Sequence, residues 1–365
     1  MAFEGFPHLV GWELTLACNL RCRHCASSAG AVRTRELTLP EALAICEQFP
    51  ELLVREVIFT GGEPFLNPGW AAIAAKLQDC NIKTGIVTNG LAITGDLIRQ
   101  MKESGLKSAG ISIDGPEAVH DGIRSVSGAF QKTVSGARHL AEAGIDLTVI
   151  TSVTALNVTS LDQMFELVRS LGAWKWQLQP LFPTGRGQTH GDLHLSYDQF
   201  LQLGNFIREH GAIDPKHSLR IVPADSCGYF SELDLPEYGW RGCTAGLSSV
   251  GIMSDGRVKG CLSWPDWTAE GDLRHDDLWT IWFRESSFAH LRTFNPNQVE
   301  GVCQGCDCLA ECAGGCEAMS LATTGKWHSD PYCYRRLLQL TQSDRSLPDE
   351  VCRQLDDRIA ASGRT

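Results

Sequence analysis

The positions of the cysteines constrain this chain more than any other feature of its sequence. Of fifteen cysteines, three form Cys18-x-x-x-Cys22-x-x-Cys25, and a second group runs from Cys243 to Cys333. Thiols stay reduced inside cells, so clustered cysteines indicate metal binding rather than disulfides. The alternative is a disulfide-rich secreted protein. We set it aside because residues 1–12 carry no secretory leader pattern and residues 9–210 are typical of a cytosolic α/β domain.

Residues 9–210 alternate short apolar or β-branched runs with helical stretches. The strands predicted from this pattern are 10–16, 55–60, 83–87, 108–113, 146–151 and 174–178. Two helices carry start signals, with capping boxes at 38–41 and 196–199. Six strand–helix units in series predict an α/β fold with a partial (β/α)6 TIM-like barrel. An open doubly wound sheet is the alternative.

The composition of the sequence changes after about residue 215, where glycine, cysteine and tryptophan become frequent. Residues 244–262 predict a β-hairpin with its turn at Ser254-Asp255-Gly256. Residues 300–333 are predicted to be loop-rich and organised by metal, and one more helix is predicted after 335. We therefore divide the chain into a core domain at 1–215, a linker at 216–240, a smaller cysteine-rich domain at 241–340 and a helical tail at 341–365.

A polar or glycine-rich motif follows each of the first four predicted strands. These motifs are the three-cysteine motif, Gly61-Gly62-Glu63-Pro64, Thr88-Asn89-Gly90 and Ser112-Ile113-Asp114-Gly115. Each one taken alone is more simply a turn, because Asn-Gly and Asp-Gly are common turn dipeptides. Together they predict one site, because the chemistry of a β/α barrel sits at the C-terminal ends of its strands.

Three cysteines are one ligand short of a closed four-cysteine site. One interpretation is a zinc site completed by His24, although His24 and the adjacent Cys25 would chelate one ion with strain. The other is a [4Fe–4S] cluster with one iron open to a non-protein ligand, as a catalytic metal requires. The spacing alone leaves both interpretations open.

The three-cysteine motif after the first strand and Gly61-Gly62-Glu63-Pro64 after the second resemble the radical S-adenosylmethionine superfamily over residues 9–210. The resemblance implies a [4Fe–4S] cluster on Cys18, Cys22 and Cys25, with the open iron binding the amino and carboxylate groups of S-adenosylmethionine. It implies that the cofactor-binding residues are Gly61, Gly62, Glu63, Asn89, Ser112, Asp114 and Arg124.

The resemblance also implies separate roles for these side chains. Glu63 would hold the amino group of S-adenosylmethionine, while Asn89, Ser112 and Asp114 would contact its ribose and methionine end. The Arg124 guanidinium would pair with the methionine carboxylate through its two-pronged geometry. A surface salt bridge is an equal alternative for Arg124.

The second cysteine group resembles, spacing for spacing, the seven-cysteine SPASM extension of radical enzymes over residues 240–335. The resemblance implies two auxiliary [4Fe–4S] clusters, which brings the total to three. The first auxiliary cluster would be ligated by Cys243, Cys261 and Cys316, and the second by Cys303, Cys306, Cys312 and Cys333. For the fourth ligand of the first we favour Cys227 over a position left open for substrate. Two structural zinc sites are the alternative for this region.

The remaining cysteines do not match ligand positions. Cys46 and Cys80 lie in helical patterns and are interpreted as small buried hydrophobes, and Cys352 as incidental. Cys308 lies among the cluster ligands without matching one of them. It is either a spare thiol or, as our hypothesis, a catalytic hydrogen-atom or proton donor near the substrate.

The composition excludes some partners. The net charge of −11 disfavours nucleic acid and anionic lipid. No apolar run reaches the roughly 20 residues that a membrane span requires. We therefore expect a cytoplasmic protein without nucleic-acid or membrane partners, reduced by an external electron donor such as flavodoxin or ferredoxin.

The resemblance implies that S-adenosylmethionine is cleaved reductively and that a 5′-deoxyadenosyl radical abstracts a hydrogen atom from the substrate. Our first hypothesis is an enzyme that crosslinks, epimerises or oxidises a residue of a ribosomally made peptide or protein, although no peptide-binding domain precedes Cys18. The second is a small-molecule enzyme, because residues 12–15 and 180–187 resemble the tetrapyrrole side-chain enzymes, with Arg186 available to a carboxylate. The third is an iron–sulfur binding or electron-transfer protein.

Overall fold

The computed structural model describes residues 5–211, 219–224, 227 and 242–342. Most of the predicted linker and nearly all of the predicted tail lie outside these residues. The described strands form one ten-stranded sheet in the order β10-β9-β8-β1-β2-β3-β4-β5-β6-β7. Their bounds are β1 Leu9–Thr15, β2 Glu56–Gly61, β3 Lys83–Thr88, β4 Ser108–Ser112, β5 Asp146–Val153, β6 Lys175–Pro180, β7 Arg220–Pro223, β8 Ser249–Ile252, β9 Arg257–Lys259 and β10 Gly271–Asp272.

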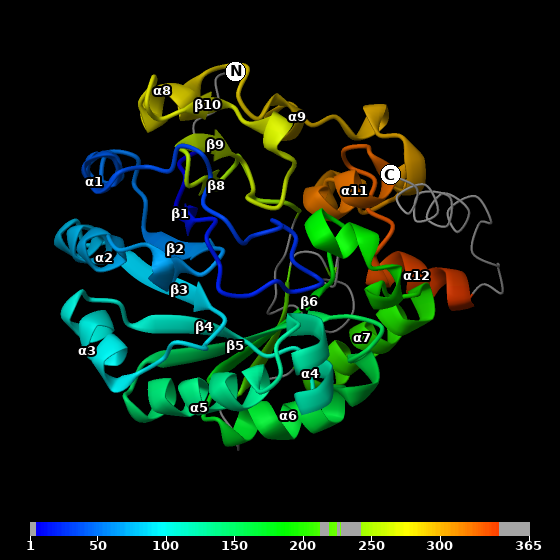
Figure 1. The fold of residues 1–365 in the computed structure, drawn as a ribbon. Helices are drawn as coiled ribbons and strands as arrows, with labels where there is room; N and C mark the ends of the chain where they lie inside the picture. Colours follow the sequence, from blue (N-terminus) through cyan, green and yellow to red (C-terminus); the bar gives the residue numbers. More distant parts are fainter. Residues whose placement is uncertain (1–4, 212–218, 225–226, 228–241, 343–365) are drawn as a thin grey trace.

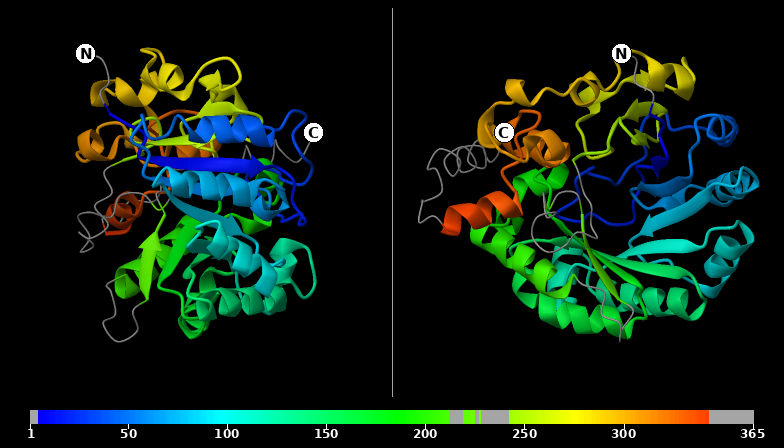
Figure 2. Two further views of the ribbon diagram at one scale, coloured as in Figure 1. Left: turned by 90° about the vertical axis from the view of Figure 1, so that its left-hand side faces the viewer. Right: turned by 180° about the vertical axis from the view of Figure 1, so that it is seen from behind.

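Strands β1 to β7 lie side by side in chain order and are all parallel. A doubly wound sheet would reverse its strand order at a switch point, so this alternative is wrong and the partial barrel is confirmed. Figures 1 and 2 show the sheet curving into an open, C-shaped wall. All six predicted strands are present, with ends shifted by at most a few residues.

Among the described residues, seven α-helices follow the core strands and five belong to the cysteine-rich part. The first set is α1 Leu39–Cys46, α2 Trp70–Asp79, α3 Gly95–Glu103, α4 Glu117–Arg124, α5 Ala129–Glu142, α6 Leu161–Ser170 and α7 Tyr197–His210. The second set is α8 Leu278–Phe283, α9 Ala289–Arg292, α10 Leu309–Cys312, α11 Glu317–Thr324 and α12 Tyr334–Gln342. Both predicted capping boxes are present, at the start of α1 and of α7.

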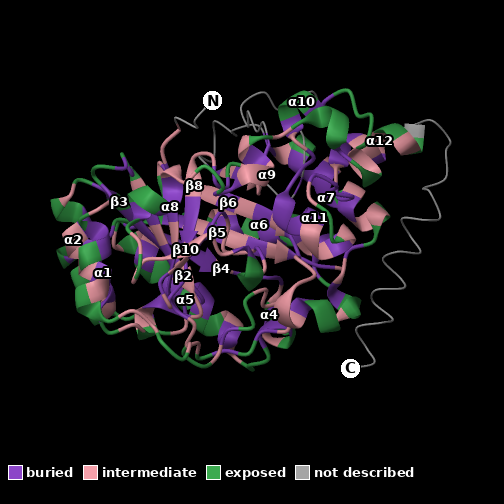
Figure 3. Ribbon diagram, turned by 90° about the horizontal axis from the view of Figure 1, so that it is seen from above, coloured by how far each residue is buried: buried purple, intermediate pink, exposed green. Residues whose placement is uncertain are grey.

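The strands direct alternate side chains outward beneath the helices and inward into the barrel. On β6, Trp176 and Leu178 are buried, whereas Lys175, Gln177 and Gln179 are half-buried on the opposite face. Helices α2, α3 and α5 cover the outer face of the wall in Figure 1, and Figure 3 shows the buried strands at the centre of the molecule. The apolar core therefore lies between sheet and helices, which leaves the inner face to the site.

The predicted hairpin is formed by β8 and β9, which pair antiparallel. Its first strand also pairs parallel with β1, from Leu9 opposite Ser249 to Trp12 opposite Ile252. The cysteine-rich region therefore continues the core sheet instead of standing apart from it, as Figure 1 shows at β8 and β1. Among the described helices, none is both long enough and apolar enough to cross a membrane.

Candidate functional site

A cavity of about 370 Å³ lies at the C-terminal ends of the core strands. All four predicted motifs contribute to it, as the end-of-strand argument predicts. Of the predicted site residues, the lining includes Cys18, Cys22, Cys25, Gly61, Gly62, Asn89, Ser112 and Arg124. Glu63 and Asp114 are fully buried behind this lining.

The three thiols of the first motif are each oriented by a hydrogen-bond donor. The Leu20 amide donates to Cys18 Sγ and the Ala29 amide to Cys25 Sγ, both at 3.4 Å. Arg124 Nη1 donates to Cys22 Sγ at 3.7 Å. Donors of this kind stabilise anionic sulfur, whether as a thiolate or as a cluster ligand.

This donor set fits an iron–sulfur cluster. Burial raises the pKa of the Cys18 and Cys22 thiols, so binding of metal must displace their protons. Within the described ranges, no three Cys, His, Asp or Glu side chains are grouped around the position of a single ion. The three thiols line one cavity and could supply three of the four ligands of a cluster, leaving one iron for a non-protein ligand.

Gly61 and Gly62 bring β2 against the cysteine segment. Gly62 N donates to Thr15 O at 2.9 Å, and Glu63 N donates to Ala17 O at 2.8 Å. A Cβ at Gly62 would lie 2.1 Å from Ala17 O, and Gly61 has a φ of +124° that L side chains rarely adopt. The two glycines therefore allow the backbone that leads into Cys18 to pack directly on β2.

We expect Gly62→Ala to lower both stability and iron content. The methyl group would push the Ala17 carbonyl and the adjacent Cys18 out of place, at a cost of about 1–3 kcal/mol. Urea unfolding of the cluster-free protein and iron analysis after reconstitution measure the two effects. The control is Gly122→Ala at an exposed position of α4, where a Cβ would meet nothing within 4 Å. Parental stability and iron content in Gly62→Ala would contradict the packing role.

Glu63 connects the ends of β2 and β3. Its carboxylate accepts from Thr88 Oγ1 and from the Asn89 amide, both at 2.9 Å. The Asn89 side chain in turn donates to Asn19 Oδ1 at 2.7 Å, within the cysteine segment. Burial raises the pKa of Glu63 to about 7. The role of Glu63 toward an amino group stays a prediction.

The raised pKa of Glu63 predicts a pH-dependent stability. Between about pH 4.5 and 7 the unfolded chain loses the Glu63 proton while the folded chain keeps it, so the free energy of unfolding falls as pH rises. Relative to Glu63→Gln, the cluster-free parent should lose about 3 kcal/mol across this window. If the free energies of unfolding of the two proteins changed in parallel with pH, the raised pKa of Glu63 would be contradicted.

Asp114 and Arg124 form a buried ion pair behind the cavity. Arg124 Nε donates to Asp114 Oδ2 at 2.7 Å, while Nη2 lies 2.5 Å from the same oxygen. The Ser152 amide donates to Asp114 Oδ1 at 3.0 Å. Arg124 holds the pKa of Asp114 below its ordinary value, although burial opposes this. The surface salt bridge considered for Arg124 is thus replaced by a buried one that reaches Cys22.

His24 faces this pair as well. Its Nε2 lies 3.4 Å from Asp114 Oδ2, and burial lowers the pKa of His24 to about 4, so the ring is neutral. Asp114 N donates to Nδ1 of another buried histidine, His120. Nε2 of His24 is therefore turned to a carboxylate, while its Nδ1 is buried without a hydrogen-bond partner among the described residues.

The loop after β6 clamps the cysteine segment. Arg186 Nε donates to Cys22 O at 2.8 Å and its Nη1 to Ala29 O at 2.9 Å. The Arg186 amide donates to Cys25 O at 3.0 Å. The sequence suggested Arg186 for a substrate carboxylate, whereas the structure uses two of its three guanidinium nitrogens to hold this segment.

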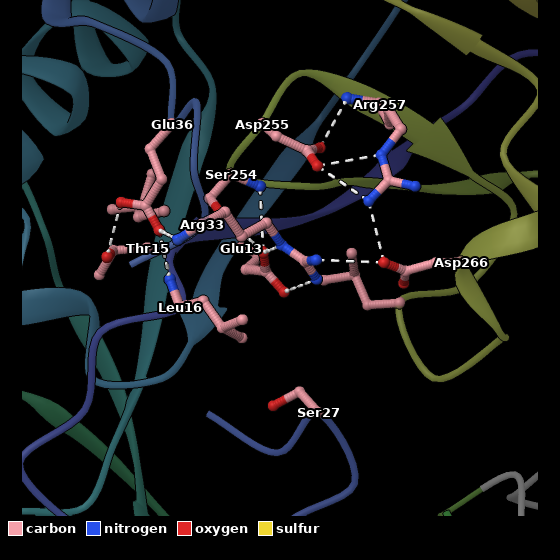
Figure 4. Close-up of polar contacts among 12 residues, drawn as sticks. Glu13, Thr15, Leu16, Ser27, Arg33, Glu36, Ser254, Asp255, Arg257 and Asp266 are labelled. Carbon is pink, nitrogen blue, oxygen red and sulfur yellow. Dashed lines mark hydrogen bonds and ion pairs between the residues drawn. The ribbon is translucent and has the colours of Figure 1, made fainter. Parts of the chain in front are cut away.

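A further polar network joins the cavity to the hairpin (Figure 4). Glu13 on β1 lines the cavity and pairs with Arg33 Nε at 2.7 Å. Arg33 Nη1 continues to Asp266 at 3.1 Å, and Ser254 in the hairpin turn donates to Glu13 Oε1. Lys259 Nζ, from β9, donates to Asp266 Oδ1 at 3.3 Å. Sequence reasoning missed this network, since no local pattern indicates contacts between segments more than two hundred residues apart.

The cysteines of the first auxiliary site come together in part. Burial raises the pKa of Cys316, and the nearby Cys243 and Cys261 thiols raise it further. Cys227 is buried, with Sγ 3.6 Å from Leu178 O on β6. Its assignment as the fourth ligand stays a prediction.

A second cavity, of about 280 Å³, lies between α10 and α12. It is lined by five cysteines, namely Cys303, Cys306, Cys308, Cys312 and Cys333. Arg336 also lines it, and Arg336 Nη1 is buried without a hydrogen-bond partner among the described residues. An orphaned cationic nitrogen beside thiols fits an anionic thiolate-bound cluster. Cys308 thus lies at this second cavity and not in the lining of the first, where a hydrogen donor to the substrate would be needed.

Comparisons with known proteins agree with the two-part organisation. The radical SAM superfamily model matches residues 12–170, and the SPASM model, an iron–sulfur cluster-binding domain, matches residues 243–307. The AdoMet-dependent heme synthase of Methanosarcina barkeri is 30% identical, over 92% of this chain and 99% of that protein. The mycofactocin maturase MftC of Mycobacterium tuberculosis is 30% identical, over 87% of this chain and 80% of that protein.

Among solved structures, Streptococcus suis SuiB bound to S-adenosylmethionine superposes with a TM-score of 0.73 at 18% identity, covering 90% of this chain and 77% of SuiB. That likeness concerns the fold, a radical SAM partial barrel with a C-terminal cysteine-rich part. The matched family models, the similarity to the heme synthase over nearly its whole length and the three thiols around one cavity agree. The chain therefore belongs to the radical SAM superfamily and carries a C-terminal SPASM iron–sulfur domain.

Proposed function

We propose that this radical SAM enzyme oxidises a side chain of a carboxylate-bearing tetrapyrrole. The observation that carries this choice is the hollow interior of the barrel, together with the similarity to a heme synthase over nearly its whole length. The peptide hypothesis, placed first on sequence grounds, becomes the second candidate. A binding or electron-transfer protein is set aside, because the relatives are synthases and maturases.

The first cavity continues into a larger space of about 1000 Å³ on the inner face of the sheet. Val87, Ile150 and Gln177 line both spaces. Gly85 and Gly110 occupy inner positions of β3 and β4, where a Cβ would lie 2.9 Å from Ile58 Cδ1 and 2.7 Å from Ile150 Cδ1, so neighbouring side chains pack over both glycines. A concave space of this size suits a small molecule, since ligand pockets run to about 1,000 Å³.

A cationic residue is available at the far end of this space. Lys175 is half-buried, lines the larger space and lies 5.0 Å from the centroid of the Trp174 ring. Burial lowers the pKa of its ammonium, although the Glu56 carboxylate in the same lining opposes this effect. A substrate carboxylate beside it would reverse this effect, because an opposite charge favours the charged form. We propose that Lys175 pairs with such a carboxylate and that Arg186 does not.

When bound, the clusters and S-adenosylmethionine supply reductive cleavage, removal of a hydrogen atom from the substrate and an acceptor for the electron that a net oxidation releases. We propose three [4Fe–4S] clusters, with Cys18, Cys22 and Cys25 holding the one in the first cavity. Ser112, Asn89 and Arg124 lie around that cavity where they can orient a polar cofactor. An external donor such as flavodoxin or ferredoxin would supply the electron.

The test is 5′-deoxyadenosine formation under anaerobic conditions with dithionite. We expect an iron tetrapyrrole with propionate side chains to accelerate 5′-deoxyadenosine formation and to lose mass as it reacts. Lys175→Met should raise the KM for that substrate by about tenfold, since one ion pair contributes on the order of 1.4 kcal/mol. Acceleration only by peptides would overturn the proposal in favour of the second candidate.

Modification of a peptide residue is that second candidate. It is favoured by the similarity to the mycofactocin maturase, which is as identical in sequence as the heme synthase although less of its length is covered. A panel of peptides in the same assay distinguishes the two, because the products differ in mass and in visible absorbance.

A further inference from the structure

Five thiols surround the second cavity, whereas a four-iron cluster takes four protein ligands. The seven-cysteine pattern assigns Cys303, Cys306, Cys312 and Cys333 to this cluster and leaves Cys308 over. In the structure Cys308 lines the cavity together with the other four. It is 8% exposed and packs with Cys312 and Cys333 in one small buried group. The residue without a role in the pattern is thus in the interior of the site.

Cys306 is placed differently. It is exposed, and its Sγ lies 3.8 Å from the carboxylate oxygen Oδ1 of the neighbouring Asp307. Cys308 is buried only two residues further along, at the start of α10. One short loop therefore presents two thiols to the same cavity, one from the solvent side and one from the protein side.

The loop between these two thiols contacts α12 on the other side of the cavity. Arg335 Nη2 on α12 pairs with Asp307 Oδ2 at 3.1 Å, and the Cys312 amide donates to Cys308 O at 2.9 Å. Arg336, whose Nη1 has no hydrogen-bond partner among the described residues, lines the cavity from the same helix as Arg335. Its charge favours an anionic cluster at this position whichever of the two cysteines completes it.

We infer that Cys308 is a ligand of the second auxiliary cluster and can bind the iron that the pattern assigns to Cys306. The inference rests on the three-cluster complement proposed above. The exchange moves no electrons: Cys308 releases its thiol proton to solvent as its iron–sulfur bond forms, and Cys306 takes up a proton as its own bond breaks. The buried thiol keeps the cluster in place when the exposed one is alkylated or lost.

Iron and sulfide analysis of full-length variants tests this, with electron paramagnetic resonance of the reduced proteins as a second readout. The reconstituted parent should hold about twelve irons per chain. Cys306→Ala should keep about twelve with an altered resonance signal, because one ligand has changed. Cys306→Ala/Cys308→Ala should hold about eight. Cys46→Ala, at the buried cysteine that ends α1, is the control for removing a thiol and should keep about twelve.

Two results would overturn the inference: a fall to about eight irons in Cys306→Ala alone, or about twelve irons in the double variant. A fall in Cys308→Ala alone, with Cys306→Ala intact, would support it by making Cys308 the main ligand. A parent with about eight irons would remove the second auxiliary cluster, and with it this inference, which separates that failure from a failure of Cys308.

Discussion

Cys22→Ala is expected to abolish formation of 5′-deoxyadenosine from S-adenosylmethionine and to remove about four irons per chain. Cys22 is the middle cysteine of the first motif and is 6% exposed. Its Sγ accepts from Arg124 and its carbonyl from Arg186, so two distant segments hold it at the cavity. Without it two thiols remain, too few for the cluster. The rate should fall to background, a loss of at least about 10⁶-fold.

The measurement uses anaerobically purified and reconstituted protein with dithionite and S-adenosylmethionine. Cys46→Ala is the matched control, because Cys46 is equally buried but lies outside both cysteine-lined cavities. A Cys22→Ala protein that still makes 5′-deoxyadenosine at the parental rate would show that the first cavity is not the cleavage site. A fully loaded parent that is silent alone but active with a tetrapyrrole would show cleavage gated by substrate.

The barrel could be predicted from the sequence because its signals are local. Period-two runs, capping boxes and strand-end motifs each lie within a few residues, so β1 to β6 and their helices follow from them. The pairing of β8 with β1 could not be predicted, since it joins segments about 240 residues apart and both strands also read as ordinary hairpin or barrel strands. The short β7 carries too few residues for a pattern.

The same distinction applies to the site. Cysteine spacing predicts the cluster ligands because cluster chemistry requires particular residue types at fixed intervals. The side chains that hold those cysteines in place could not be predicted from the sequence. Arg186 looked free for a substrate but holds the cysteine segment, and Arg33 with Glu13 carried no signal. A side chain that supports another through tertiary contact has no sequence pattern of its own.

Arg124→Met is expected to destabilise the cluster-free protein by about 3–5 kcal/mol. The substitution keeps most of the side-chain volume but leaves the fully buried Asp114 carboxylate without its cation. An unpaired buried charge costs far more than an exposed one, because water cannot reach it. Urea unfolding at neutral pH measures the loss, and working without clusters keeps loss of the cluster out of the measurement.

A double-mutant cycle identifies the unpaired charge as the cause. Asp114→Asn/Arg124→Met should recover much of the loss, because the amide can still accept from Ser152 and carries no charge to desolvate. Arg99→Met is the matched control, since Arg99 pairs with Asp96 at 3.0 Å on the exposed face of α3. Breaking that pair should cost only about 0–1 kcal/mol. If Arg124→Met cost no more than Arg99→Met, the buried ion pair would contribute little to stability. If Arg124→Met were costly but the double variant recovered nothing, the loss would lie in packing around Cys22 and not in the unpaired charge.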